Sequence, residues 1–243
     1  IVMTSTNERI NIFNNVSSKL VCTSNTQLSQ MLATGKLAHT GIGGSSFQIE
    51  IDGTPVFVKK IPITELELTS SNYMSTSNMF KLPLCYQYGI GSTGFSAWRE
   101  LAAHIMTTNW VITHKCIHFP IMYHWRILND NHKKIMSNDE KIRLDKDNAY
   151  WENNPEIYQR LKARILATTH VCIFVEFIPY NLYQWLNKKI NDNDQEAVEA
   201  IKLIELQMQN TNNFMGSENF LHMDVHFENI ITDSDNIYYS DLD

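Results

Sequence analysis

The spacing of hydrophobic and polar positions changes several times along this chain, and each change predicts a different element. The clearest β pattern lies in residues 47–60, where two alternating runs, FQIEI and PVFVKK, flank Asp52-Gly53. An Asp-Gly pair between β-favouring runs is a strong hairpin signal. Two further apolar runs, PIMYHWRIL and VCIFVEFI, predict two more strands.

Helical spacing is strongest in residues 96–112, SAWRELAAHIMTTNWVI. Ser96 is a candidate N-cap for this helix. Three of its apolar residues recur at the spacing of a buried helix face: Leu101, Ile105 and Met106. The first 35 residues give a weaker signal, and they predict a helix only over 26–34, with Gly35 as its stop.

The second half of the chain also favours helices. After Pro179, the pattern predicts a short helix over NLYQWLNKKI and a longer one over residues 194–210. The longer helix would place four apolar residues on one face: Ala197, Ile201, Ile204 and Met208. The last residues predict a loop followed by a hairpin. Two polar segments, 68–95 and 129–160, predict a long loop and a surface excursion.

Length and composition narrow the class of protein. With 243 residues, 43% hydrophobic and 19% charged, the chain can form one large domain or two small lobes around an apolar core. A net charge of -6 gives no indication of a nucleic-acid partner. The four cysteines have no paired spacing, no apolar run approaches the roughly 20 residues that span a bilayer, and no signal-peptide pattern is present. We therefore expect a cytoplasmic protein without a membrane span.

The most informative segment is residues 221–243, LHMDVHFENIITDSDNIYYSDLD. It contains the pattern H-x-D-x-x-x-x-N at His222, Asp224 and Asn229, and Asp241 follows twelve residues later. Upstream, the chain carries a glycine-rich stretch, TGIGGSSF, a lysine at the end of VFVK, a helix with a glutamate, and an apolar strand that runs into a connector. Taken alone, the acids and the amide could also serve turns and caps.

The order of these motifs resembles the protein-kinase-like superfamily, which includes small-molecule kinases of the aminoglycoside-phosphotransferase type. The resemblance covers residues 37–243 and implies an α+β, two-lobed fold, with an N-terminal antiparallel sheet plus helix and a mainly helical C-terminal lobe. The implied parts are an N-terminal extension (1–36), an N-terminal lobe (37–178) with insertions at 68–95 and 129–160, and a partial C-terminal lobe (179–243). We expect that the kinase-like domain is truncated at this point.

The resemblance also assigns roles to the final segment. Phosphoryl transfer from ATP depends on positioning and on neutralising the charge of the phosphoryl oxygens. Asp224 would orient the acceptor hydroxyl and take its proton, while Asn229 and Asp241 would bind magnesium.

Three positions in this segment depart from the protein-kinase pattern. His226 stands where Ser/Thr protein kinases carry a lysine, and its imidazole could still contact the γ-phosphate. Met223 replaces the arginine before the catalytic aspartate, so docking of a phosphorylated activation loop is not expected. The sequence DLD at 241–243 replaces D-F-G, which keeps the metal-binding aspartate and loses the glycine.

Lys59, in VFVK, corresponds to the strand lysine that neutralises ATP phosphates and that a helix glutamate holds. Lys60 is the alternative, although strand alternation turns it to the opposite face. Glu100 is the preferred partner, because it lies on the strongest helix after the strand. Glu65 and Glu67 are nearer in the sequence but occupy a less convincing helix.

The remaining nucleotide contacts are implied in the same way. Four residues of the glycine-rich stretch would lie against the phosphates: Gly41, Gly43, Ser45 and Ser46. Ser46 takes the place of the third glycine, and the glycines could also serve a plain turn. Backbone groups from Glu176 to Ile178 would bind adenine where the apolar strand leads into the connector.

Together these motifs predict an ATP-dependent phosphotransferase that requires magnesium. We favour Ser or Thr hydroxyls of a protein as the acceptor, because the two insertions offer surface for protein contacts. The alternatives are a small-molecule kinase of the aminoglycoside or choline phosphotransferase type, and a pseudokinase that acts as a binding module. Retention of the polar catalytic positions argues against the pseudokinase.

Overall fold

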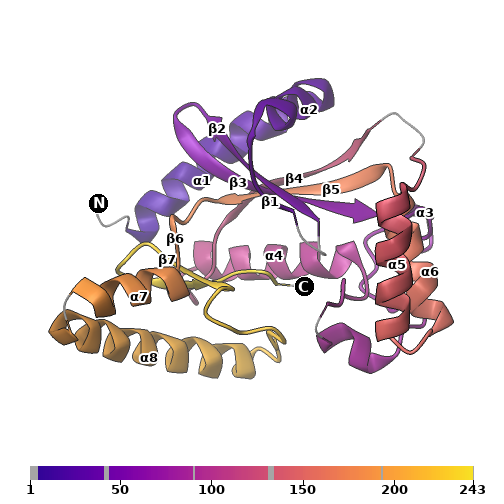
Figure 1. Cartoon of the computed structure of the whole chain (residues 1–243). Coiled ribbons are helices and arrows are strands. Elements are labelled where there is room, and N and C mark those ends of the chain that lie inside the picture. The colour runs from indigo at the N-terminus through magenta and orange to yellow at the C-terminus, as the bar shows by residue number, and fades with distance from the viewer. Residues whose placement is uncertain (1–4, 41–43, 90, 131–133, 193, 243) are drawn as a thin grey trace.

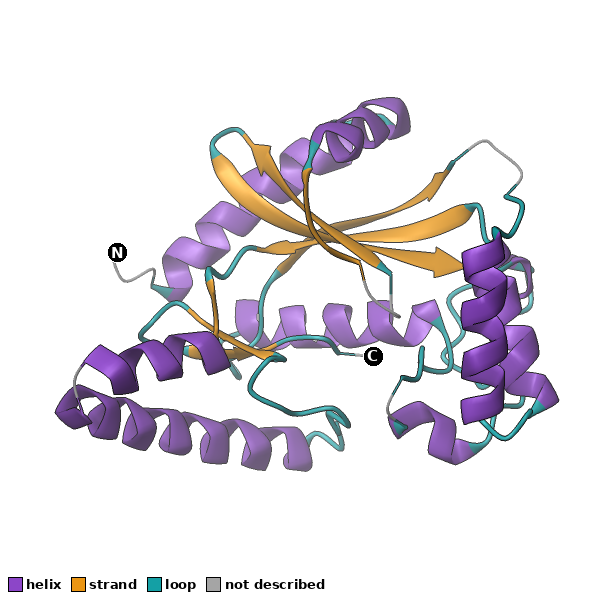
Figure 2. Ribbon diagram, in the orientation of Figure 1, coloured by secondary structure: helices purple, strands orange, loops and turns teal. Residues whose placement is uncertain are grey.

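Five antiparallel strands form the sheet around which the N-terminal part of the chain is built (Figures 1 and 2). The computed structural model describes residues 5–40, 44–89, 91–130, 134–192 and 194–242. The strands are β1 (Lys36–Thr40), β2 (Ser45–Ile51), β3 (Thr54–Ile63), β4 (Met122–Asn129) and β5 (Thr169–Glu176). Their spatial order is β1-β2-β3-β5-β4. The chain is therefore an α+β protein with an antiparallel sheet, as the sequence predicts.

The β2–β3 hairpin turns at Asp52-Gly53, as the sequence predicts. Both turn residues have positive φ angles, 47° and 82°, which a two-residue turn that matches the strand twist requires. Across this hairpin Lys59 pairs with Ser46, and Lys60 pairs with Ser45. Cross-strand partners share a face, so the two lysines lie on opposite faces of the sheet.

Helices surround this sheet on both faces and at one end (Figure 1). They are α1 (Thr6–Cys22), α2 (Asn25–Thr34), α3 (Glu65–Leu68), the 3₁₀ turn η1 (Leu84–Tyr88), α4 (Ala97–Ile112), α5 (Asn138–Tyr150) and α6 (Pro155–Leu166). The two helices predicted over 26–34 and 96–112 are confirmed, because α2 and α4 begin and end within one residue of those ranges. Serine caps both N-termini, Ser24 in α2 and Ser96 in α4.

The alternation of β3 separates two apolar cores. Val56 and Val58 pack with α1 and α2 on one face. Ile61 packs with Trp98 and Leu101 of α4 on the other face. Figure 1 shows α1 and α2 above the sheet and α4 below it. Because adjacent residues of a strand point to opposite faces, one strand serves both cores.

Four sequence-based expectations are wrong or incomplete. The weak pattern of residues 1–35 does not predict α1, which begins at Thr6 and buries Arg9. Residues 129–160 are not a surface excursion, because they contain α5 and the start of α6 and contribute buried side chains to a third core. The helical spacing predicts that Met106 and Ile201 lie on buried faces, yet both are exposed.

The C-terminal part of the chain forms a smaller layer below the sheet (Figure 1). It contains α7 (Leu182–Asp192), α8 (Asp194–Ser217) and a second sheet of β6 (Tyr180–Asn181), β7 (Ile230–Thr232) and β8 (Ile237–Tyr239). The predicted helices and terminal hairpin are thus confirmed.

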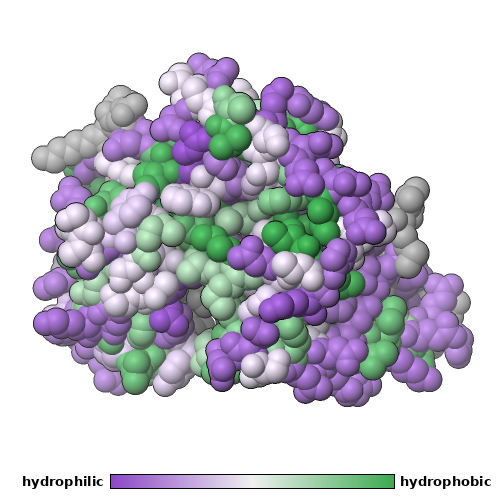
Figure 3. Space-filling model, turned by 180° about the vertical axis from the view of Figure 1, so that it is seen from behind, coloured by the Kyte–Doolittle hydropathy of each residue, from purple (hydrophilic) through white to green (hydrophobic). Residues whose placement is uncertain are grey.

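In Figure 3 the far side of the molecule shows hydrophobic residues near its centre among hydrophilic ones. Within the described residues, no helix has the length and apolar character needed to cross a membrane.

Candidate active site

Lys59 connects three parts of the chain that are distant in sequence. Its ammonium nitrogen lies 2.5 Å from Oε1 of Glu100 on α4 and forms a short ion pair with Asp241 near the C-terminus. The ammonium of Lys60 lies 2.8 Å from Asp130 on the other face of the sheet. The structure therefore brings Lys59, and not Lys60, together with Glu100 and Asp241.

Glu100 is placed by the start of α4. The Ser96 hydroxyl accepts hydrogen bonds from the backbone N–H groups of Trp98 and Arg99, and it sets the first turn. Glu67 reinforces this end, because its Oε1 accepts a hydrogen bond of 2.9 Å from the N–H of Ala97. Glu100 then lies in the first turn of α4, with its side chain directed into the protein.

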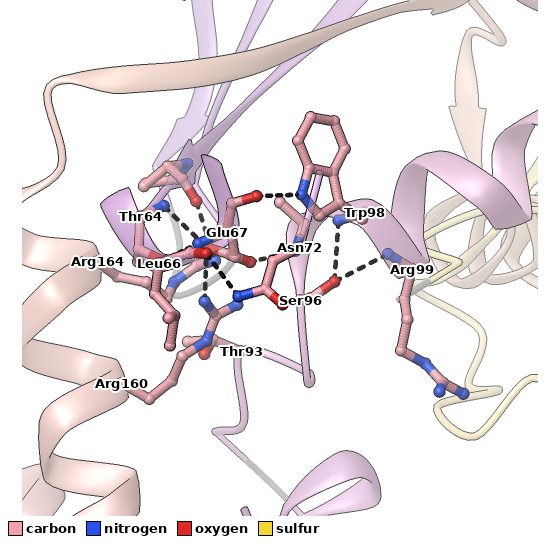
Figure 4. Close-up of polar contacts among 12 residues, drawn as sticks. Thr64, Leu66, Glu67, Asn72, Thr93, Ser96, Trp98, Arg99, Arg160 and Arg164 are labelled. Atoms are coloured by element: carbon pink, nitrogen blue, oxygen red, sulfur yellow. Dashed lines mark hydrogen bonds and ion pairs between the residues drawn. The ribbon is translucent and has the colours of Figure 1, made fainter. Parts of the chain in front are cut away.

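Of the two alternative glutamates, Glu65 is exposed and Glu67 has a different partner. Its carboxylate is buried and lies 2.8 Å from the Arg160 guanidinium of α6 (Figure 4). Thr64 adds two hydrogen bonds, from its backbone N–H and its hydroxyl. Burial alone would raise the pKa of Glu67, but the charge of Arg160 and these hydrogen bonds lower it below its ordinary value. Glu67 is therefore an ionised anchor for α4.

Asp224 and Asn229 form a compact loop before β7. The Asn229 amide donates hydrogen bonds of 3.0 Å to both the backbone carbonyl and Oδ2 of Asp224. Nε2 of His226 lies 3.7 Å from the same carboxylate oxygen, and Nδ1 accepts from the N–H of Glu228. The Asp224 side chain is 66% exposed, so a ligand can approach it from solvent.

Backbone contacts hold this loop against the segment that carries Asp241. The ring of His222 lies within hydrogen-bond distance, 2.7 Å, of the Ser240 carbonyl. The N–H and the hydroxyl of Ser240 both donate to the Asn229 carbonyl, at 2.9 and 2.8 Å. The loop that carries Asp224 and Asn229 is thus hydrogen-bonded to Ser240, the residue before Asp241.

The Asp241 backbone has a φ angle of 57°, which is uncommon for residues other than glycine. Such conformations are costly and concentrate at functional sites. The charge of Lys59 holds the pKa of Asp241 below its ordinary value, against the opposing effect of burial. Asp241 is therefore a carboxylate at neutral pH.

His104 belongs to this site, although no motif in the sequence points to it. It lies one turn after Glu100 on α4 and is only 5% exposed. Among the described residues, its Nδ1 has no hydrogen-bond partner. Burial, followed by the charge of Lys59, lowers the pKa of His104 to about 3, against the opposite influence of Asp241. The position one helical turn beyond Glu100 was the only signal that could have suggested it.

The predicted adenine contacts lie where β5 leaves the sheet. Glu176 ends β5, and its N–H donates to the Ile121 carbonyl at 2.8 Å. Its carboxylate binds Arg9 of α1, so that this side chain is part of the scaffold. Ile178 is half-buried in the connector that leads to β6.

The residues of the glycine-rich stretch separate into two groups. Ser46 is buried and shares a face with Lys59, and its hydroxyl lies 3.4 Å from the His39 carbonyl. Ser45 shares a face with Lys60 instead, so the structure does not bring it to Lys59. Gly41 and Gly43 lie outside the described residues.

Asn229 and Asp241 have the donor atoms that a magnesium ion requires. Among the described residues, no hydrogen bond uses the amide oxygen of Asn229 or Oδ2 of Asp241. Hard oxygen donors of this kind suit magnesium, which usually keeps water and takes phosphate oxygens as well. The described part of the chain holds no cluster of three or more His, Cys, Asp or Glu side chains for a metal. A magnesium ion here would therefore depend on water and ligand oxygens to complete its coordination.

No protein-family model matches this chain, and no curated protein is detectably similar to it in sequence.

Proposed function

We propose that this protein is a magnesium-dependent phosphotransferase that takes its phosphoryl group from ATP. The proposal depends chiefly on one observation, the two ion pairs that Lys59 makes with Glu100 and Asp241. A strand lysine that a helix glutamate holds beside a metal-binding aspartate is the arrangement that kinases use to neutralise phosphate charge.

A two-lobed, protein-kinase-like fold belongs to the same proposal. It is supported by the five-stranded antiparallel sheet with α4 below it, and by the passage from β5 through a short connector into α7 and α8. The loop at 222–229 and the β7–β8 hairpin then come last in the chain, in the order that the resemblance implies.

In the proposed reaction, Asp224 orients the acceptor hydroxyl and accepts its proton as the oxygen attacks the γ-phosphorus. The bond from that phosphorus to the β–γ bridging oxygen breaks, and ADP leaves. Lys59 neutralises phosphate charge, and Glu100 keeps the lysine in place. Bound by Asn229 and Asp241, magnesium would neutralise further charge on the phosphate oxygens. His226, whose Nε2 lies 3.7 Å from Asp224, would donate a hydrogen bond to the transferred group.

For the acceptor we propose a Ser or Thr hydroxyl of a polypeptide. Three apolar residues that alternate with the polar residues of the loop are between 40% and 45% exposed: Met223, Val225 and Phe227. An open, partly apolar surface around Asp224 suits an extended polypeptide better than a small, highly polar aminoglycoside. A small-molecule kinase and a pseudokinase are the outcomes that the next experiment separates from this proposal.

The test is incubation with radiolabelled ATP and magnesium, alone, with general protein substrates, and with a panel of aminoglycosides, choline and sugars. We expect label on Ser or Thr of a polypeptide and a loss of about 10² to 10⁴ in rate for Asp224→Asn. Asp235→Asn is the matched control, because Asp235 lies in the β7–β8 turn and its substitution should leave the rate unchanged. Label only on small alcohols would contradict the proposal of a polypeptide acceptor. No transfer to any acceptor would contradict the proposed phosphotransferase activity.

A further inference from the structure

A second candidate site lies on the face of the sheet opposite the Lys59 side chain. It is a pocket of about 280 Å³ where β2, β3 and β5 meet α5 and α6. These two helices stand at one end of the sheet in Figure 1. The polar side chains that line it include Lys60, Lys134, Arg143, Arg164 and His170. Nothing in the proposed phosphotransferase uses this pocket.

The lining of the pocket has an excess of positive charge. Four permanent cations line it, whereas only two carboxylates do, those of Glu140 and Asp147. Lys134 lies 3.1 Å from Glu140. Arg143 lies 3.8 Å from Asp147, which is longer than a hydrogen bond. The Arg143 guanidinium can therefore turn toward a ligand at little cost.

Arg164 gives the pocket a buried charge at its base. It is 6% exposed, and its NH1 group lies 3.4 Å from the Pro62 carbonyl. Burial and the nearby charge of Arg160 lower the pKa of Arg164 to about 10, so that it stays cationic at neutral pH. Attraction to an anion is stronger in such a poorly solvated position than at the surface.

His170 contributes a neutral polar group. Burial, followed by the charge of Lys60, lowers the pKa of His170 to about 4. Its Nδ1 lies 3.4 Å from Asp130, the same carboxylate that pairs with Lys60. Asp130 thus offsets the charge of Lys60 on this side, and Arg143 and Arg164 are the two guanidinium groups of the lining.

Four of the other lining residues are apolar. Phe47, Pro62, Leu161 and Ile165 line the pocket beside the cations. A ligand that fills both parts needs an anionic head and an apolar body. The volume of about 280 Å³ lies just below the usual range for ligand pockets, so the pocket admits one small ring or short aliphatic group and not a dinucleotide.

We propose that this pocket binds a small, free phosphate monoester, with the phosphate between Arg143 and Arg164 and the apolar body against Phe47. A phosphate monoester carries roughly -1.5 to -2 charges at pH 7, opposite in sign to the four cations of the lining. Guanidinium groups bind phosphate with two parallel hydrogen bonds, so that arginine is well suited to this ligand. The site is independent of the proposed phosphotransferase.

Isothermal titration calorimetry with phenyl phosphate tests the proposal on the full chain. We expect saturable binding that weakens about tenfold or more in Arg143→Gln. Lys146→Gln is the matched control, because Lys146 is an exposed cation of the same helix that does not line the pocket. Both positions are on the surface, so neither variant should unfold the protein.

Inorganic phosphate and benzyl alcohol separate the two parts of the ligand. Each should bind at least about tenfold more weakly than phenyl phosphate, because each occupies half of the pocket. The proposal is overturned if phenyl phosphate does not bind at millimolar concentration, or if both variants weaken it equally. A phosphotyrosyl peptide that binds more tightly than phenyl phosphate would overturn the assignment to a free small molecule.

Discussion

Arg9 and Glu176, which are 167 residues apart, form a bidentate ion pair inside the protein. Nε of Arg9 lies 2.8 Å from Oε1, and NH2 lies 2.7 Å from Oε2 of the carboxylate. The two side chains are only 2% and 11% exposed. Arg9 also donates to the carbonyls of Ile117 and Phe119. The first helix is thereby joined to the point where the chain leaves the main sheet.

Arg9→Met is expected to lower the free energy of unfolding by about 3 kcal/mol or more, because it leaves a buried carboxylate without its cation. Lys19→Met on the same helix is the control. Lys19 pairs with Asp52 at 3.3 Å, but both side chains are exposed, and such pairs contribute about 0 to 1 kcal/mol. Urea denaturation measures both variants, and equal losses would contradict the structural role of Arg9.

Lys59→Ala should remove most of the increase in melting temperature that ATP and magnesium produce. Saturating ligand at roughly a hundredfold over its dissociation constant stabilises a protein by about 2.7 kcal/mol. Lys60→Ala should keep this increase, because Lys60 lies on the other face and pairs with Asp130. If a thermal-shift assay shows that Lys60→Ala removes the increase and Lys59→Ala keeps it, the nucleotide binds on the face of Lys60 and the proposed site is wrong.

Asp224→Ala and Asp241→Ala should fail in different ways. Asp241 pairs with Lys59, and among the described residues its Oδ2 has no hydrogen bond, so on the proposed function its loss should weaken binding of the magnesium–nucleotide complex. Asp224 lies in the exposed loop, and its loss should spare binding and reduce turnover by about 10² to 10⁴. Nucleotide titration and transfer rates are measured together, and an equal loss of affinity in both variants argues against separate roles.

The buried His104 should make the protein less stable as the pH falls. Its pKa is about 3 in the folded protein and about 6.5 in the unfolded chain, so the unfolded chain takes up the proton first. The stability is complete above pH 6.5 and is lost progressively below it, by about 2 kcal/mol at pH 5.

Urea denaturation from pH 7.5 to 4.5 gives this slope directly. His104→Leu should flatten it, whatever the variant does to stability at pH 7.5. Part of the slope should remain, because burial also lowers the pKa of His170 to about 4. An unchanged slope in His104→Leu would show that His104 does not carry the effect.

Local signals in the sequence are sufficient to predict several elements of the fold and the faces on which two lysines lie. Asp52-Gly53 determines the β2–β3 turn, since both residues tolerate positive φ angles. Ser96 determines where α4 begins, since its hydroxyl satisfies the first free N–H groups. Strand alternation was enough to separate Lys59 from Lys60. Each of these signals acts over a few residues, so each can be recognised without knowledge of the rest of the chain.

Only the tertiary structure determines which charged residues that are far apart in the sequence form ion pairs. Glu67 and Glu100 are both glutamates near helix N-termini, and packing assigns Arg160 to one and Lys59 to the other. The polar pattern of 129–160 suggested solvent, yet Arg160 is fully buried because Glu67 supplies its counter-charge. Periodicity records which side chains are apolar, whereas the burial of a charged residue depends on an opposite charge that arrives from elsewhere in the chain.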